Sequence, residues 1–152
     1  MLERVRKSRS GLLIEVKSPS KYPGIAQDLA DELAAQPGYL KSAIANERLV
    51  VQSFDWNFMA EFNGIRPDVA AGLLGTPTRE QLPELATSAD QINPHFSAVN
   101  QDFVDAVHEH GMDMNVWTVD DPQEMRRLID LGVDGIITNK PNELDIVVGD
   151  AR

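Results

Sequence analysis

The sequence contains no cysteine among its 152 residues. Disulfide bonds, thiolate nucleophiles and cysteine-based zinc sites are therefore excluded. The sequence also lacks any apolar run near the roughly 20 residues that a membrane-spanning helix needs, so we expect no membrane span. The basic N-terminal stretch, residues 1–10, is followed by a short apolar stretch that ends at Glu15. Because this is not the pattern of a secretory signal peptide, we expect a cytoplasmic location.

Basic residues are few. The chain has 14 Lys and Arg against 24 Asp and Glu, a formal net charge of -10. Nucleic acids and anionic membrane surfaces bind basic faces, so we expect neither as a partner. An anionic small substrate would need a metal ion or local basic groups to hold it. Hydrophobic residues make up 42% of the chain, enough for a buried core, and the length predicts a single domain over residues 1–152.

Six short apolar runs alternate with helical patterns along the chain. They are nearly continuous rather than alternating, which predicts strands buried on both faces of a parallel sheet with helices outside it. An open doubly wound sheet and part of a (β/α)8 barrel both fit this pattern. The chain is too short for a complete barrel, which needs about 250 residues. The predicted strands lie in residues 11–14, 49–51, 69–74, 90–92, 114–119 and 135–138.

Four helices have recognisable ends. Ser, Thr, Asn or Asp before an apolar stripe is typical of a helix start, proline is favoured in the first turn, and glycine is favoured just past the end. The start signals are Pro23 before Ile25, Leu29 and Leu33; Thr78 with Gln81 in a capping box; Asn100; and Asp121 with Pro122 and Glu124. The stop signals are Gly111 and Gly132.

Glu15 and Lys17 are the first candidate site residues. They lie two positions apart on a predicted strand, so their side chains should point to the same face. Opposite charges at the end of a buried strand are costly unless they are paired or bind something. One interpretation is a carboxylate for a divalent metal and an ammonium group for a phosphate. The other is a salt-bridged pair at a strand end, and the spacing does not decide between them.

Three further strand ends carry polar or aromatic residues. Ser53 has no partner typical of a nucleophilic serine, so we expect its hydroxyl to cap the following turn. Trp117 could line a substrate pocket or simply fill the core. Thr138 and Asn139 could reach a phosphate or could cap a rim turn.

The three histidines do not form a metal site in the sequence. His108 and His110 lie two positions apart on a predicted helix, whereas a metal pair on a helix needs a spacing of four. We therefore expect both to be solvated. His95 follows a predicted strand, and a loop histidine without a placed partner is more often structural or exposed.

Taken together, several segments closely resemble the glycerophosphodiester phosphodiesterase family. Their order and spacing match the third to the eighth strand of that family's barrel and cover nearly all of the chain. The tryptophan segment and the last segment are the most specific pair. The segments are IEVKSP, KYPG, VVQSFD, AGLLG, INP, NVWTVDDP and GVDGIITNKP.

The resemblance implies a partial (β/α)8 barrel of about six parallel strands with outer helices. It also implies hydrolysis of glycerophosphodiesters to sn-glycerol 3-phosphate and an alcohol, with a divalent cation, commonly Ca²⁺ or Mg²⁺. A family metal ligand falls on Glu15, an active-site lysine falls on Lys17, and a pocket aromatic falls on Trp117. No feature of the sequence indicates which alcohol the substrate carries.

Other motifs of the family are absent. The sequence has no His-Arg or His-Asp dipeptide and no Glu-x-Asp before Glu15. The resemblance implies that these missing motifs would supply two metal ligands and two acid/base histidines. Each missing proton transfer is worth roughly 10²–10⁴ in rate. We therefore expect an N-terminally truncated family member with little or no diesterase activity by itself. The alternatives are a non-catalytic fragment that binds a partner chain or self-associates through open sheet edges, and an unrelated phosphate-binding α/β protein.

Overall fold

The computed structural model describes residues 10–150, and the basic stretch at residues 1–9 lies outside them. The chain folds into two compact units, Met1–Leu74 and Gly75–Arg152. Each unit is described by itself below, and the single-domain organisation stays a prediction.

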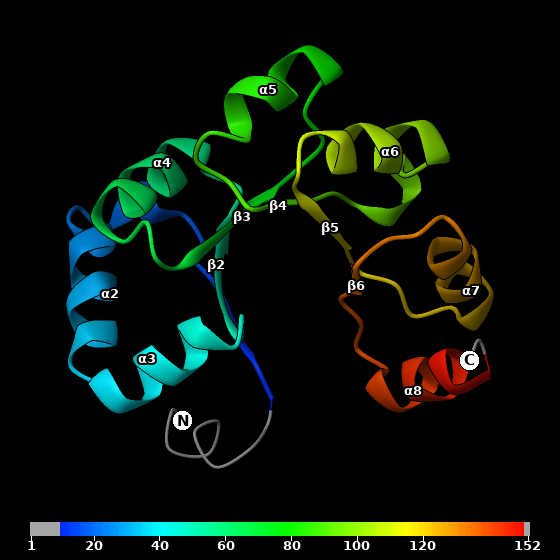
Figure 1. Cartoon of the computed structure of the whole chain (residues 1–152), viewed down its shortest axis with the longest axis horizontal. Coiled ribbons are helices and arrows are strands. Elements are labelled where there is room, and N and C mark those ends of the chain that lie inside the picture. Colours follow the sequence, from blue (N-terminus) through cyan, green and yellow to red (C-terminus); the bar gives the residue numbers. More distant parts are fainter. Residues whose placement is uncertain (1–9, 151–152) are drawn as a thin grey trace. The chain divides into compact units, whose positions relative to one another are not determined.

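The first unit is a three-stranded parallel sheet covered by three helices. Its elements are β1 (Leu12–Glu15), the 3₁₀ turn η1 (Pro19–Lys21), α2 (Ile25–Ala34), α3 (Pro37–Ala45), β2 (Leu49–Ser53), α4 (Trp56–Ile65) and β3 (Ala70–Leu74). The strand order is β1-β2-β3, with Ile14 opposite Val51 and Val51 opposite Ala71. Figure 1 shows α2, α3 and α4 on one side of these strands.

Alternate residues of β2 and β3 form the core of the first unit against the helices. Val51 and Ala71 are fully buried, and Phe62 of α4 is 0% exposed. The rings of Phe58 and Phe62 stack with centroids 6.2 Å apart. Burying one such phenylalanine stabilises the fold by about 1.5–3 kcal/mol, so this face holds the three strands in place.

The second unit repeats the same strand-helix pattern. Its elements are η2 (Arg79–Gln81), α5 (Leu82–Leu85), β4 (Gln91–Asn93), η3 (Phe96–Ala98), α6 (Gln101–Glu109), β5 (Asp113–Val116), α7 (Pro122–Asp130), β6 (Gly135–Ile136) and α8 (Pro141–Asp150). The strands are parallel in the order β4-β5-β6. Met114 and Val116 of β5 are fully buried together with Val107 of α6 and Leu128 of α7. α6, α7 and α8 lie on one side of these strands in Figure 1.

The predicted helix ends at Thr78, Asn100, Asp121, Gly111 and Gly132 are confirmed, whereas Pro23 precedes the Gly24 N-cap of α2 and does not lie in its first turn. The Asn100 side chain accepts a hydrogen bond from the Phe103 backbone N–H at 2.9 Å, and Asp121 accepts from the N–H groups of Gln123 and Glu124. The Gln81 side chain accepts from the Thr78 N–H at 2.9 Å, as a capping box requires. Gly111 and Gly132 have φ of 74° and 84°. These are left-handed conformations that glycine adopts without a steric penalty.

Expectations about three strands need correction. β6 ends at Ile136 rather than at residue 138. β1 is not buried on both faces, since Leu13 is 43% exposed. Among the described residues β1 pairs with β2 alone, so only one flank of the strand is covered. The fifth strand ends at Val116 rather than Val119, because Trp117 makes only an isolated bridge to His95. No helix among residues 10–150 is long and apolar enough to span a bilayer.

Candidate functional site

A cavity of about 800 Å³ opens at the carboxyl ends of β1 and β2. In parallel α/β folds the active site is built at this end of the strands. The lining comes from the ends of both strands and the turns that follow them. It consists of Glu15, Val16, Lys17, Ser18, Pro19, Ser53, Phe54, Asp55, Trp56 and Asn57.

Glu15 and Lys17 lie together in this cavity, as the alternation of strand residues predicts. The Lys17 Nζ is 3.7 Å from the Glu15 Oε1. The Lys17 side chain is 78% exposed and the Glu15 side chain is 31% exposed. The expectation of a costly buried charge pair is therefore wrong. An exposed ion pair contributes only about 0–1 kcal/mol of stability. Stability alone therefore gives little reason for this pair, and both charges can reach a ligand in the cavity.

The backbone turns sharply directly after Lys17. Ser18 has φ 50° and ψ 51°, a left-handed conformation that costs a non-glycine residue on the order of 1–3 kcal/mol. The following residue is Pro19, which disfavours helical conformations of the residue before it. Such strain persists only where surrounding contacts enforce it. The turn follows Lys17, which lies two residues beyond the end of β1, and it brings Pro19 into the cavity wall.

Ser53 serves the structure of this turn. Its Oγ donates a 2.7 Å hydrogen bond to the carbonyl oxygen of Val16 and accepts one from the Asp55 N–H at 3.1 Å. Ser53 is 1% exposed. The expected capping hydroxyl is therefore found. Asp55 in turn caps α4 by accepting from the Phe58 N–H at 3.1 Å.

The oxygen ligands for a divalent cation are incomplete among the described residues. Glu15 lies opposite Gln52 in the β1–β2 register, which gives one carboxylate beside one buried amide. Residues 10–150 contain no group of three His, Asp or Glu side chains that could hold a metal ion. Mg²⁺ and Ca²⁺ take six or more oxygen ligands. Glu15 can supply one of these ligands, but this set does not fit a cation by itself.

Trp117 lies in the second unit, directly after β5. Its Nε1 donates to the Asn93 carbonyl oxygen at 2.9 Å. Its ring meets the His95 ring edge to face, with centroids 5.1 Å apart and planes at 81°. Trp117 is thus held at the carboxyl end of β5 by a backbone hydrogen bond and an aromatic contact. Its role as a pocket aromatic stays a prediction.

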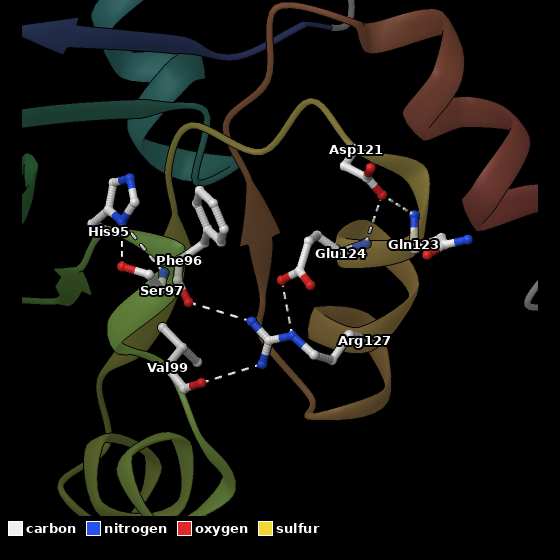
Figure 2. Close-up of polar contacts among 8 residues, drawn as sticks. All are labelled: His95, Phe96, Ser97, Val99, Asp121, Gln123, Glu124 and Arg127. Atoms are coloured by element: carbon white, nitrogen blue, oxygen red, sulfur yellow. Dashed lines mark hydrogen bonds and ion pairs between the residues drawn. The ribbon is translucent and has the colours of Figure 1, made fainter.

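The loop that carries His95 is tied to α7 through Arg127 (Figure 2). Arg127 donates to the carbonyl oxygens of Val99 and Phe96 at 3.2 and 3.4 Å, and its Nε donates to Glu124 at 2.9 Å. His95 Nδ1 lies 2.7 Å from the Ser97 Oγ. These contacts favour the structural interpretation of His95. Sequence reasoning missed this role of Arg127, because Val99 and Phe96 lie about 30 residues before it in the chain.

Asp120 organises the turn after β6. Its carboxylate accepts from the Thr138 hydroxyl at 3.0 Å, the Asn139 N–H at 2.8 Å and the Asn139 side-chain amide at 2.9 Å. The hydrogen bond from the Asn139 side chain, followed by that from its backbone, lowers the pKa of Asp120. These contacts favour the rim-turn interpretation of Thr138 and Asn139. Asp120 itself was not singled out from the sequence.

His108 is not simply solvated, which corrects the expectation. Its Nε2 lies 2.8 Å from the Asp134 Oδ2, and that same oxygen accepts from the Met114 N–H at 2.8 Å. Asp134 thereby joins α6 to the start of β5. The Nδ1 of His110 lies 2.8 Å from the Ala106 carbonyl oxygen. Both histidines thus have structural partners within the second unit.

Comparison with known proteins identifies the family. Residues 1–143 match the Glycerophosphoryl diester phosphodiesterase family. The glycerophosphodiester phosphodiesterase of Bacillus subtilis (strain 168) is 30% identical over 135 residues, which are 85% of this chain and 46% of that protein. The structure of a glycerophosphodiester phosphodiesterase from Parabacteroides distasonis ATCC 8503 is 29% identical, with a TM-score of 0.74 over 99% of this chain and 63% of that one.

The chain therefore belongs to the glycerophosphoryl diester phosphodiesterase family. Its fold class is a partial (β/α)8 barrel of six parallel strands with alternating helices. A structure from Agrobacterium tumefaciens str. C58 supports the fold alone, with a TM-score of 0.78 at 20% identity over 99% of this chain. The chain spans 46% to 60% of the length of the first three curated relatives it matches.

Proposed function

We propose that this chain supplies part of the active site of a phosphoric diester hydrolase that converts glycerophosphodiesters to sn-glycerol 3-phosphate and an alcohol. Family membership and the 30% identical Bacillus subtilis glycerophosphodiester phosphodiesterase support this reaction class. The observation that carries the proposal is the pair formed by Glu15 and Lys17, 3.7 Å apart in a cavity at the strand ends.

Lys17 is suited to bind the phosphoryl group. Its ammonium carries three donors and a full positive charge, and its 78% exposed side chain can follow a ligand in the cavity. Charge develops on the phosphoryl oxygens as the diester reacts, and a positioned cation stabilises that charge. Lys17 therefore contributes both to binding of the diester and to the rate of its cleavage.

Glu15 is suited to provide one carboxylate ligand to Ca²⁺ or Mg²⁺. Such an ion, when bound, would neutralise charge on the phosphoryl oxygens. The other carboxylate residue of the cavity lining, Asp55, already caps α4 by accepting from the Phe58 N–H. Further oxygen ligands would therefore be needed beside Glu15 and the Gln52 amide opposite it.

The chain alone is proposed to have little turnover. Hydrolysis needs a general base and a general acid, most often histidine, and the described cavity lining includes no histidine. We infer that groups outside this cavity lining complete the catalytic machinery.

The proposal is tested by fusing the N-terminal part of the Bacillus subtilis relative to this chain. The fusion should hydrolyse glycerophosphocholine in the presence of Ca²⁺ or Mg²⁺, and Glu15→Gln should abolish that turnover. Glu32→Gln removes the same charge from the exposed surface of α2. This control variant should retain the turnover of glycerophosphocholine. Unchanged turnover in Glu15→Gln would remove Glu15 from the site.

Self-association is the second candidate function. β1 has one strand neighbour among the described residues, and its Leu13 is 43% exposed. A strand with an unpaired edge is a template for pairing with another chain. Native mass spectrometry of the chain decides this, because a monomer at micromolar concentration would contradict self-association.

A further inference from the structure

We propose that His95 is a positioning residue, which holds the Trp117 ring in the orientation that binds the diester. The inference rests on the proposed function and on the predicted role of Trp117 as its pocket aromatic. His95 acts through Trp117 and does not itself have to touch the substrate. The inference is carried by contacts that lie entirely within the second unit.

Trp117 is fixed along its backbone and at one edge of its ring. Its N–H donates to the Pro94 carbonyl oxygen at 3.2 Å, and its carbonyl accepts from the Phe96 N–H at 3.0 Å. These bonds form the parallel bridge between His95 and Trp117. The indole Nε1 donates to the Asn93 carbonyl oxygen at 2.9 Å. One hydrogen bond at Nε1 still allows the indole plane to tilt, so a second contact is needed to fix the ring.

The His95 ring makes that second contact. The two ring centroids lie 5.1 Å apart, and the ring planes meet at 81°. This is the edge-to-face arrangement that aromatic pairs favour, because a ring edge is positive and a ring face is negative. The attraction weakens when either ring turns away from this angle. His95 therefore resists tilting of the Trp117 indole about its Nε1 hydrogen bond.

Ser97 holds the His95 ring in turn (Figure 2). The Ser97 backbone N–H donates to His95 Nδ1 at 3.3 Å, and the Ser97 Oγ lies 2.7 Å from the same nitrogen. Nδ1 presents its lone pair to the N–H, so neutral His95 carries its proton on Nε2. The Phe96 ring lies beside the imidazole, with centroids 4.5 Å apart. The imidazole thus has the fixed orientation that a positioning residue requires.

The backbone of this turn is attached to α7. Arg127 donates to the carbonyl oxygens of Phe96 and Val99, the residues that follow His95 on either side of Ser97 (Figure 2). Direct contacts therefore lead from α7 to the turn, from the turn to the His95 ring, and from that ring to Trp117.

Two substitutions separate positioning of Trp117 from simple capping of the turn. His95→Asn keeps an acceptor for the Ser97 N–H, since asparagine is a favoured capping residue, but it removes the ring. His95→Phe keeps a ring and removes the acceptor. If His95 positions Trp117, the order of the indole follows the ring. If His95 only caps the turn, the order of the indole follows the acceptor.

The test is fluorine NMR of the full 152-residue chain labelled with fluorotryptophan. The chain has two tryptophans, and Trp56→Phe assigns their resonances. We expect His95→Asn to move the Trp117 resonance towards that of free fluorotryptophan. The same variant should bind glycerophosphocholine about two- to tenfold more weakly, the range of one aromatic pair. His95→Phe should retain most of both properties.

Two controls accompany these variants. His110→Asn removes another histidine of the second unit, whose Nδ1 lies 2.8 Å from the Ala106 carbonyl oxygen, and should leave the Trp117 resonance unchanged. The Trp56 resonance, from the first unit, should be the same in every His95 variant.

The inference is overturned if His95→Asn keeps the wild-type Trp117 resonance or the wild-type affinity, or if His95→Phe behaves as His95→Asn does. The proposed function is judged on the wild-type chain alone. If that chain does not bind glycerophosphocholine, the proposed function is contradicted and the inference is lost with it. Binding that leaves the Trp117 resonance unmoved contradicts only the inference.

Discussion

The Ser53 hydroxyl donates a 2.7 Å hydrogen bond to the carbonyl oxygen of Val16, the residue between Glu15 and Lys17. This bond joins the carboxyl ends of β1 and β2 at the point where the candidate site is built. A residue of the second strand thereby fixes the backbone that carries both charged side chains.

Ser53→Ala should destabilise the chain by about 1–2 kcal/mol, because the variant leaves a part-buried carbonyl and the Asp55 N–H without the hydroxyl. Denaturant unfolding measures the loss. Thr87→Ala is a matched control, since the Thr87 hydroxyl makes only an exposed local bond to the Glu84 carbonyl and its removal should cost less than about 0.5 kcal/mol. Equal effects of the two variants would show that the Ser53 bond does not stabilise the site.

Asp120→Asn should change the acid dependence of stability. Hydrogen bonds from Asn139 and Thr138 lower the pKa of Asp120 below its unfolded value of 3.8. The folded state therefore binds fewer protons than the unfolded state near that pH, and the contribution of Asp120 is present above about pH 4. It is lost as the pH falls through the lower pKa of the folded state.

Melting temperatures measured from pH 2.5 to 6 test this prediction. The wild-type chain should lose stability more steeply on acidification than Asp120→Asn. Asn139→Ala should cost stability at pH 6 in the wild-type background but much less in the Asp120→Asn background, because the two side chains bond to each other. Parallel pH profiles for the wild type and Asp120→Asn would contradict the role assigned to Asp120.

Arg127→Lys should loosen the loop that carries His95. Lysine keeps the charge but cannot donate at once to Glu124, Val99 and Phe96 as the guanidinium does (Figure 2). We expect a loss of about 1–2 kcal/mol in unfolding free energy. Arg126→Lys, at the adjacent exposed position, should cost less than about 0.5 kcal/mol. If Arg127→Lys leaves the free energy of unfolding unchanged, the contacts of Arg127 do not stabilise the loop.

Local signals predicted much of the fold because helix caps act over three or four residues. The Asn100 and Asp121 caps are found as expected. α4 was missed, although Asp55 with Phe58, Met59 and Phe62 at helical spacing would have indicated it. The Ser53 hydroxyl reaches the Val16 carbonyl only because β2 pairs with β1. No spacing rule brings together residues so far apart in the chain.

Burial could not be predicted from composition at the strand that matters most. The apolar run of β1 suggested coverage on both faces, yet Leu13 is 43% exposed and Lys17 is 78% exposed. Exposure depends on neighbouring elements rather than on the run itself. The alternation of side chains along a strand is a local property, and it correctly placed Glu15 beside Lys17.

The most direct test of the account is an amide NMR titration of the chain with sn-glycerol 3-phosphate. We predict that the shifts concentrate in residues 15–19 and 53–57, and that Lys17→Met weakens binding about tenfold by removing a charged donor. Lys21→Met, which removes an exposed lysine outside the lining of this cavity, should bind as the wild type does. Shifts centred elsewhere, or equal binding by the wild type and Lys17→Met, would contradict the assignment of this cavity as the phosphate site.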